Sequence, residues 1–194
     1  MTCWPSNKYS YLDIIVGPMS SGKTSKIVEI YNYCIKYNIS VVAINHTLDI
    51  RYGINNITTH DKISIPCIQV NKLSDIFNNK EYNKKLSESN VVLINEGQFF
   101  EDLFDSVNYI LEKLFKQIHV CGLDGDFKRQ KFGQILDLIP YCDSVTKLKA
   151  KCNNCPLGQP ALFSFRISND AQQTCVGFNN YKSLCRYCYC KIIN

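Results

Sequence analysis

The fold of this protein is decided by one stretch of its sequence, Gly17-Pro18-Met19-Ser20-Ser21-Gly22-Lys23-Thr24. This stretch fits the Gly-x-x-x-x-Gly-Lys-Ser/Thr pattern of a phosphate-binding loop. A mostly apolar run, residues 12–16, precedes it, and residues 27–35 after it carry apolar side chains at helical spacing. A loop between a strand and a helix directs backbone N–H groups and the helix N-terminus at one anion. We therefore predict that the loop binds the phosphates of ATP.

Two side chains of the loop have distinct expected roles. Lys23 is expected to reach the β- and γ-phosphates, and Thr24 is expected to hold the Mg²⁺ ion that accompanies ATP. The alternative is a chance match of the pattern, but the strand before the loop and the helix after it argue against that interpretation.

Length and composition limit the architecture to one ordinary domain with at most a small addition. The chain has 194 residues, of which 45% are hydrophobic, and a net charge of +5 whose lysines are scattered rather than gathered in a run. No apolar run approaches the roughly 20 residues of a membrane span, and the first residues lack the pattern of a signal peptide. We expect a cytoplasmic protein that binds neither membranes nor nucleic acid, with its 11 cysteines reduced or bound to metal.

The segments after the first helix alternate between strand and helix patterns. Residues 40–45 predict a buried strand, 63–70 a further strand and 73–86 a weak helix. Residues 46–62 are polar and aperiodic, which predicts a functional loop with Arg51 as a candidate phosphate ligand. A disordered surface loop with a solvated arginine is the alternative.

The clearest buried strand is 90–95, and it leads directly into Glu96. In a phosphate-loop fold the strand beside the loop ends in an acid near the γ-phosphate, so Glu96 is a candidate general base or Mg²⁺-site acid. A surface glutamate at a strand end is the alternative. A helix over 103–115 and a strand over 117–123 complete an open α/β sheet with helices on both faces.

Four cysteines near the end of the chain form two Cys-x-x-Cys pairs, Cys152 with Cys155 and Cys185 with Cys188. Four thiolates in two such pairs predict a tetrahedral structural Zn²⁺ site, which here fastens the base of a long loop. A redox role is the alternative for either pair alone. We predict an ATP-binding α/β domain over residues 1–149 and a zinc-binding domain over residues 150–194.

Several separate motifs together resemble the type II thymidine kinase family. They are GPMSSGKT (17–24), DIRY (49–52), THD (59–61), NEGQFF (95–100), GLDGDF (122–127) and YKSLCRYCY (181–189), along with the four spaced cysteines. The resemblance extends over nearly the full chain. It implies a RecA-like phosphate-loop sheet followed by a small zinc-tied lasso domain that covers the nucleoside.

The resemblance also implies an activity, which is transfer of the ATP γ-phosphate to the 5′-hydroxyl of thymidine, with deoxyuridine as a second substrate and Glu96 as the base. The residues implied to bind ATP are the loop residues 17–24, Arg51, Asn95 and Gln98. The residues implied to bind the nucleoside are Met19, Leu123, Phe127, Cys175, Val176 and Tyr181. Further expectations are ATP with Mg²⁺ for turnover, structural Zn²⁺, feedback inhibition by dTTP, a homotetramer, and the host cytoplasm as location if the source is a virus.

Three positions depart from the family pattern. Asn95 replaces the usual acid before the catalytic glutamate, Ser20 replaces an aromatic residue in the phosphate loop, and Phe178 follows Gly177 where a second glycine is usual. The first change leaves open a catalytically weakened thymidine kinase homologue.

Two readings from other classes also remain open. One is a different phosphate-loop nucleoside kinase. The other is a nucleic-acid-binding zinc module on an ATPase core, for which the basic and aromatic residues near the cysteines give weak support.

Overall fold

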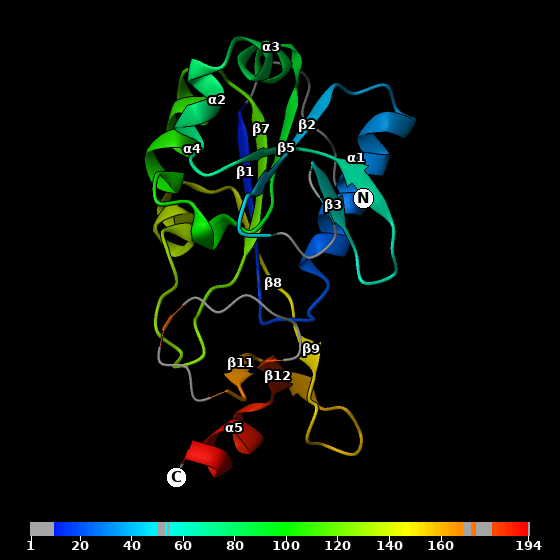
Figure 1. Ribbon diagram of the computed structural model, residues 1–194, viewed down its shortest axis with the longest axis vertical. Helices are drawn as coiled ribbons and strands as arrows, with labels where there is room; N and C mark the ends of the chain where they lie inside the picture. The colour runs from blue at the N-terminus through cyan, green and yellow to red at the C-terminus, as the bar shows by residue number, and fades with distance from the viewer. Residues whose placement is uncertain (1–9, 50–52, 54, 169–171, 174–179, 194) are drawn as a thin grey trace.

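Figure 1 shows the computed structural model of the chain, which describes residues 10–49, 53, 55–168, 172–173 and 180–193. Six parallel strands form the central sheet, as predicted, in the order β5-β2-β6-β7-β1-β8. Their bounds in that order are β5 Ile68–Val70, β2 Val41–His46, β6 Val91–Ile94, β7 Gln117–Gly122, β1 Tyr11–Val16 and β8 Ser144–Lys147. Within the described ranges, no helix is both long and apolar enough to cross a lipid bilayer.

Side chains alternate between the two faces of the sheet and build two hydrophobic cores. The core on one face joins the strands to α2 (Ser74–Asn78), α3 (Lys80–Glu88), α4 (Leu103–Glu112) and the 3-10 helix η2 (Ile135–Tyr141). The core on the other face joins them to α1 (Lys23–Lys36) and to a hairpin of β3 (Asn56–Thr58) and β4 (Ser64–Pro66). Figure 1 shows α1 and β3 on the side of the sheet opposite to α2 and α4. The predicted arrangement with helices on both faces is confirmed.

The order of the strands corrects one expectation. The strand that ends before Glu96 is not beside the strand of the phosphate loop, because β7 lies between β6 and β1 and pairs with both. Neighbouring strands lie about 4.8 Å apart, so the ends of β6 and β1 are separated by roughly 10 Å at the same edge of the sheet. The end of β7 and the residues that follow it lie between these two strand ends.

A second correction concerns residues 46–70. Part of the predicted loop folds as β3, and the single strand predicted over 63–70 is divided at Cys67 into β4, which pairs with β3, and β5, which pairs with β2. The reason is hydrophobic: Ile57 and Ile65 are cross-strand partners, both are buried, and they join the core beneath α1. The segment therefore covers one face of the sheet.

The helices also differ from expectation at two places. The weak helix predicted over 73–86 is two helices, because Asn79 has an extended backbone and its side-chain oxygen caps α3 by accepting from the N–H groups of Glu81 and Tyr82 at 3.0 and 3.1 Å. The helix predicted over 103–115 ends at Glu112, and Phe115 is exposed with a left-handed backbone.

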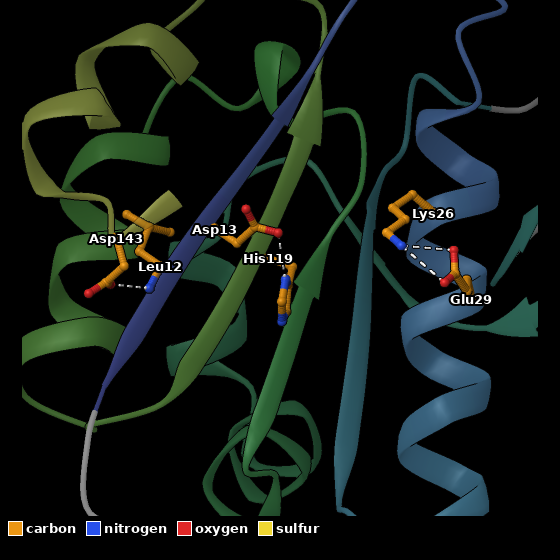
Figure 2. A network of polar contacts seen from close by, with 6 residues as sticks. All are labelled: Leu12, Asp13, Lys26, Glu29, His119 and Asp143. Carbon is orange, nitrogen blue, oxygen red and sulfur yellow. Dashed lines mark hydrogen bonds and ion pairs between the residues drawn. The ribbon is translucent and has the colours of Figure 1, made fainter. Parts of the chain in front are cut away.

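Strand β1 is fixed from both sides. Asp13 of β1 lies beside His119 of β7, with its carboxylate 3.1 Å from the histidine Nδ1 (Figure 2). On the other side, the carboxylate of Asp143 accepts a hydrogen bond from the Leu12 N–H at 2.8 Å, and the Asp143 N–H donates to the Leu12 carbonyl at 2.9 Å. Since β1 leads directly into the phosphate loop, these contacts set the position from which the loop starts.

After β8 the chain forms a smaller module with a core of its own. The described residues of this C-terminal module form two antiparallel pairs and a helix: β9 (Ala150–Lys151) with β10 (Pro160–Ala161), β11 (Phe163–Arg166) with β12 (Tyr181–Leu184), and α5 (Arg186–Ile193). Its buried residues, among them Ala161, Leu184 and Tyr189, form a separate cluster. Figure 1 shows the module beyond the end of the sheet where β1 meets the phosphate loop. The division into domains at residues 149 and 150 stays a prediction.

Candidate active site

The phosphate loop has the predicted setting, between the end of β1 at Val16 and the start of α1 at Lys23. A Cβ atom at Gly17 would lie 2.6 Å from the carbonyl oxygen of Leu148, so only glycine lets the loop pass this backbone. The Lys23 ammonium is buried and donates to the carbonyl oxygens of Gly17 and Pro18 at 3.1 and 2.8 Å. It therefore lies inside the loop, where the motif places the phosphates.

The other loop residues differ in exposure. Gly17 and Pro18 are buried, Ser20 and Gly22 are exposed, and Met19, Ser21 and Thr24 are half-buried. The hydroxyl oxygen of Ser21 is shielded from solvent and has no hydrogen-bond partner among the described residues. A buried hydroxyl without a partner is costly, and a phosphate oxygen in the loop is a suitable acceptor for it.

Glu96 has a backbone conformation that is rare for a residue with a side chain. Its φ of 53° and ψ of 42° lie in the left-handed region, which costs about 1–2 kcal/mol for a non-glycine residue. Such strain is typical of functional positions held in place by their surroundings. The side chain is half-buried, and its carboxylate accepts a hydrogen bond from the Gln98 amide nitrogen at 2.6 Å. The structure thus holds a carboxylate in a fixed direction at the carboxyl edge of the sheet.

Gln98, in the 3-10 helix η1 (Gly97–Phe99), fixes the Glu96 side chain through their hydrogen bond. Its side chain is buried, and its amide oxygen accepts a hydrogen bond from the Leu123 N–H at 2.9 Å. A Cβ atom at Gly122 would lie 2.3 Å from this oxygen, so glycine makes room for the Gln98 side chain. Both ends of the Gln98 amide are therefore bonded within the protein, and Gln98 connects Glu96 with Leu123, a residue of the predicted nucleoside side.

Asn95 belongs to a buried polar network. Its amide nitrogen donates to the Asn45 side-chain oxygen at 3.0 Å, and its own oxygen accepts from the Cys121 thiol at 3.0 Å. The Asn45 amide nitrogen donates in turn to the Asp49 carboxylate at 3.1 Å. Sequence reasoning missed Asn45 and Cys121, because they lie near the ends of β2 and β7, the two strands beside β6, and are far from Asn95 along the chain.

Three charged side chains, those of Lys23, Asp49 and Glu96, lie near the Cys121 thiol. Burial raises its pKa to about 12, the carboxylates of Glu96 and Asp49 act in the same direction, and the Lys23 ammonium opposes them. Only groups near the thiol have such effects, so the loop lysine, the candidate base and Asp49 surround one place at the carboxyl edge of the sheet. Phosphoryl transfer from ATP to a hydroxyl group uses this combination of a phosphate ligand and a carboxylate base.

The phosphate loop is bonded directly to the C-terminal module. The Met19 N–H donates to the Ser164 hydroxyl oxygen at 2.9 Å, and the Ser183 hydroxyl donates to the Met19 carbonyl at 2.6 Å. Both serines are buried, one on β11 and one on β12. Ser183 lies within the motif at residues 181–189, but sequence reasoning gave neither serine a role, because their partner Met19 is far away in the sequence. Met19 thus lies between the two parts, and its predicted double role, beside ATP and beside the nucleoside, stays a prediction.

Two further residues of the predicted nucleoside side, Phe127 and Tyr181, come together in the structure. Both contact the guanidinium of Arg166, whose central carbon is 3.9 Å from the Phe127 ring centroid and 5.1 Å from that of Tyr181. Four positions named from the sequence, Arg51, Cys175, Val176 and Phe178, lie outside the described residues. Their predicted roles remain predictions.

The four cysteines of the two Cys-x-x-Cys pairs converge in the C-terminal module. The sulfur atoms of Cys152, Cys155, Cys185 and Cys188 all lie within 4.8 Å of one another. The Cys155 sulfur is 3.7 Å from that of Cys185 and 3.5 Å from that of Cys188. Tetrahedral zinc with bonds of about 2.3 Å to sulfur needs sulfur atoms roughly 3.8 Å apart. The donor set and its spacing fit Zn²⁺.

The environment of Cys152 also favours metal binding. Burial opposes its ionisation, but the N–H groups of Cys185 and Asn154 and the neighbouring thiols outweigh burial and lower the Cys152 pKa to about 6. Metal ligation requires the thiolate form. A redox role for one pair alone is less suited to this geometry, because both pairs meet at one point.

Comparisons with known proteins agree with this site. The family model described as thymidine kinase matches residues 10–189. A thymidine kinase of Yaba monkey tumor virus (strain VR587) is 38% identical over 193 residues, which cover 97% of this chain and 99% of the viral protein. One of Sheeppox virus (strain KS-1) is 35% identical over 182 residues, 93% of this chain and 97% of that protein.

A plant relative is similar at the same level. A thymidine kinase of Oryza sativa subsp. japonica is 37% identical over 180 residues, which cover 92% of this chain but 65% of the rice protein. The match of the family model takes in the phosphate loop, Glu96 and all four clustered cysteines. This protein belongs to the thymidine kinase family.

Proposed function

We propose that the protein transfers the γ-phosphate of ATP to the 5′-hydroxyl of thymidine and so produces dTMP, with deoxyuridine as a second substrate. The observation that carries the proposal is the position of Glu96, a strained carboxylate that Gln98 holds at the same sheet edge as the phosphate loop. Membership of the thymidine kinase family supports thymidine as the acceptor.

In this reaction the 5′-oxygen of thymidine forms a bond to the γ-phosphorus, and the bond from that phosphorus to the β–γ bridging oxygen breaks. ADP leaves with the electrons of the broken bond. The proton of the 5′-hydroxyl passes to the Glu96 carboxylate, which acts as general base. Lys23 and the loop N–H groups hold the phosphates, while Phe127, Leu123 and Tyr181 contact the nucleoside.

Two metal ions belong to the proposal. Thr24, at the first turn of α1, is the residue that would hold Mg²⁺ with the ATP phosphates, and Mg²⁺ supplies positive charge to the phosphoryl group during transfer. The four cysteines would hold Zn²⁺ in a structural role, because four thiolate ligands would leave no open coordination position for a substrate or water. It ties the two ends of the module that carries Ser164, Ser183 and Tyr181.

The remaining features follow the family resemblance and are part of the proposal: inhibition by dTTP, assembly as a homotetramer and a cytoplasmic location. A nucleic-acid-binding zinc module and a different nucleoside kinase are not favoured, since the family match includes both the phosphate loop and the cysteines.

The deciding experiment is a coupled assay that measures ADP release from ATP with each deoxynucleoside in turn. We expect turnover with thymidine, weaker turnover with deoxyuridine and none above background with deoxycytidine, deoxyadenosine or deoxyguanosine. A protein that uses another nucleoside better than thymidine contradicts the substrate assignment, and a protein that uses none is a family member without this activity.

A further inference from the structure

Arg166, the last residue of β11, is a buried arginine that no motif singled out. Only 5% of it is exposed. Its Nε donates to the Tyr181 hydroxyl oxygen at 3.1 Å, and one terminal nitrogen donates to the same oxygen. The two terminal nitrogens also donate to the backbone carbonyls of Gln172 and Gln173, the latter at 2.8 Å. The planar guanidinium thus uses its fork of donors on three different residues.

The same guanidinium lies against the Phe127 ring, with its central carbon 3.9 Å from the ring centroid. A cation at this distance from an aromatic face is attracted to it, and more strongly where water is excluded. Phe127 belongs to the connection after β7, while Tyr181 begins β12. Arg166 therefore joins these two parts of the nucleoside side, and the Tyr189 hydroxyl adds a bond to the Phe127 carbonyl at 2.6 Å.

A second contact joins the segment that Arg166 holds to the residue before Phe127. The Gln173 side-chain amide donates to the Asp126 carboxylate at 2.9 Å. The other oxygen of Asp126 accepts from the N–H groups of Lys128 and Gln130 at 2.8 and 2.9 Å, so this carboxylate is itself held firmly. Asp126 precedes Phe127 in the chain. Its bond to Gln173 therefore fixes the spacing between the Phe127 backbone and the segment that Arg166 holds.

We propose that Arg166 is a positioning residue for the nucleoside, which sets the Phe127 ring and the Tyr181 hydroxyl in the places where thymidine meets them. This inference rests on the proposed function. Arg166 acts through these two residues and needs no contact with thymidine itself.

The bonding also determines what Tyr181 offers to a ligand. An arginine only donates hydrogen bonds, so the two N–H groups that meet the Tyr181 oxygen use its two acceptor positions. Any further hydrogen bond of this hydroxyl is then a donated one. A hydrogen bond between the Tyr181 hydroxyl and thymidine is therefore one that Tyr181 donates to an acceptor oxygen, and Tyr181→Phe removes it.

The test compares Arg166→Lys with Arg129→Lys as a matched control. Lysine keeps the charge of Arg166, but its ammonium cannot reproduce the planar fork toward Tyr181 and two carbonyls. Arg129 also lies over aromatic rings of the C-terminal module, 4.7 Å from the Tyr189 centroid and 5.7 Å from that of Phe163, but it is exposed. Thymidine and ATP affinities are measured separately by calorimetry on zinc-loaded protein, together with zinc content, kcat and KM.

For Arg166→Lys we expect thymidine affinity to fall and thymidine KM to rise by roughly ten- to hundredfold, because a hydrogen-bonding site is misplaced. ATP affinity and zinc content should stay within about twofold, and Arg129→Lys should leave all of these values near the wild type. Tyr181→Phe should also weaken thymidine binding. The double variant of Arg166→Lys and Tyr181→Phe should bind thymidine little more weakly than Arg166→Lys alone, since both changes remove the same contact of the Tyr181 hydroxyl.

The possible failures are distinct. A wild-type protein that does not bind thymidine overturns the proposed function and this inference together. A wild type that binds thymidine while Arg166→Lys binds it equally well overturns only the inference. Equal losses of thymidine and ATP affinity in Arg166→Lys show a general structural role and also overturn it, as does a fully additive double variant.

Discussion

The Asn95 side-chain nitrogen lies 3.0 Å from the Asn45 side-chain oxygen, so two buried amides join the ends of β6 and β2. The family resemblance pointed to Asn95 as a replacement for the usual acid before the catalytic glutamate. The structure shows that both polar ends of its amide are bonded to protein groups, one to Asn45 and one to Cys121. Asn95 is thus linked to the Asp49 carboxylate, one of the charged groups of the site, through the side chain of Asn45.

The first prediction concerns this pair. Asn95→Leu should lower the free energy of unfolding by about 1–3 kcal/mol, because the buried Asn45 oxygen loses its donor. In the double variant with Asn45→Leu, both partners are apolar, so the combined loss should be smaller than the sum of the single losses. Urea unfolding of the four proteins measures the difference. Asn83→Leu, on the exposed surface of α3, is the control, and strictly additive losses would show that the two amides do not interact.

The second prediction concerns the base. Glu96→Gln should lower kcat by ~10²–10⁴ while ATP and thymidine affinities change by no more than a few-fold, because only proton transfer is lost. The glutamine can still accept the hydrogen bond from Gln98, so the local conformation is expected to persist. Steady-state kinetics and calorimetry check this against Glu88→Gln, an exposed glutamate of α3. Wild-type turnover by Glu96→Gln means that another group is the base.

The third prediction concerns zinc. We expect one Zn²⁺ per chain by metal analysis, and we expect Cys155→Ser or Cys188→Ser to release it, since a tetrahedral site loses a quarter of its ligands. Thymidine turnover should be abolished. ATP affinity should fall as well, because β12 ends beside Cys185 and carries the Ser183 that bonds the phosphate loop. Cys190→Ser, outside the cluster, is the control, and freshly reduced wild type without zinc would refute the assignment.

The fourth prediction tests the bond between the phosphate loop and the C-terminal module in a variant that keeps all four zinc ligands. Ser183→Ala removes the hydrogen bond to the Met19 carbonyl and should weaken ATP binding by roughly three- to tenfold, as expected for about 1 kcal/mol, with zinc content unchanged. Calorimetric titration with ATP measures the effect. Ser168→Ala, at an exposed position of the same module, should bind ATP as the wild type does. Unchanged ATP affinity in Ser183→Ala would mean that the loop does not depend on the module.

The fifth prediction is a pH dependence of stability. Burial lowers the pKa of His46 below its ordinary value of 6.5, and its Nδ1 accepts a hydrogen bond from the Leu48 N–H at 3.0 Å, which an imidazolium cannot accept. In the acidic range the unfolded chain therefore binds the proton more readily than the folded one. Stability is lost as the pH falls below 6.5 toward the lowered pKa of the folded state.

The check is urea unfolding at about pH 7.5 and about pH 5.5, on either side of the ordinary histidine pKa. His46→Gln should lose less stability between these values than the wild type. His60→Gln is the control, because the His60 side chain is exposed. Equal pH dependence of His46→Gln and the wild type would show that another group is responsible.

Much of this protein could be predicted from the sequence, because the decisive signals are local. The phosphate loop at residues 17–24 needs only a strand before it and a helix after it, and both are visible as apolar periodicity. The strand predicted over 90–95 contains the continuous apolar run Val91–Ile94, and the strand predicted over 117–123 is mostly apolar. The Cys-x-x-Cys pairs carry their metal chemistry in their own spacing, and the structure brings all four sulfur atoms together.

Only the tertiary structure decided which segments become neighbours. The insertion of β7 between β6 and β1, the burial of Ile57 and Ile65 beneath α1, and the bonds from Met19 to Ser164 and Ser183 join residues far apart in the chain. Arg166 is the clearest case, because it takes a polar position in the alternating stretch of residues 163–168. Polar positions in such a pattern ordinarily face solvent, whereas the structure buries this one. Its role depends on the register of β11 with β12 and on its packing against Phe127. Both depend on contacts between distant segments, which a local sequence pattern does not specify.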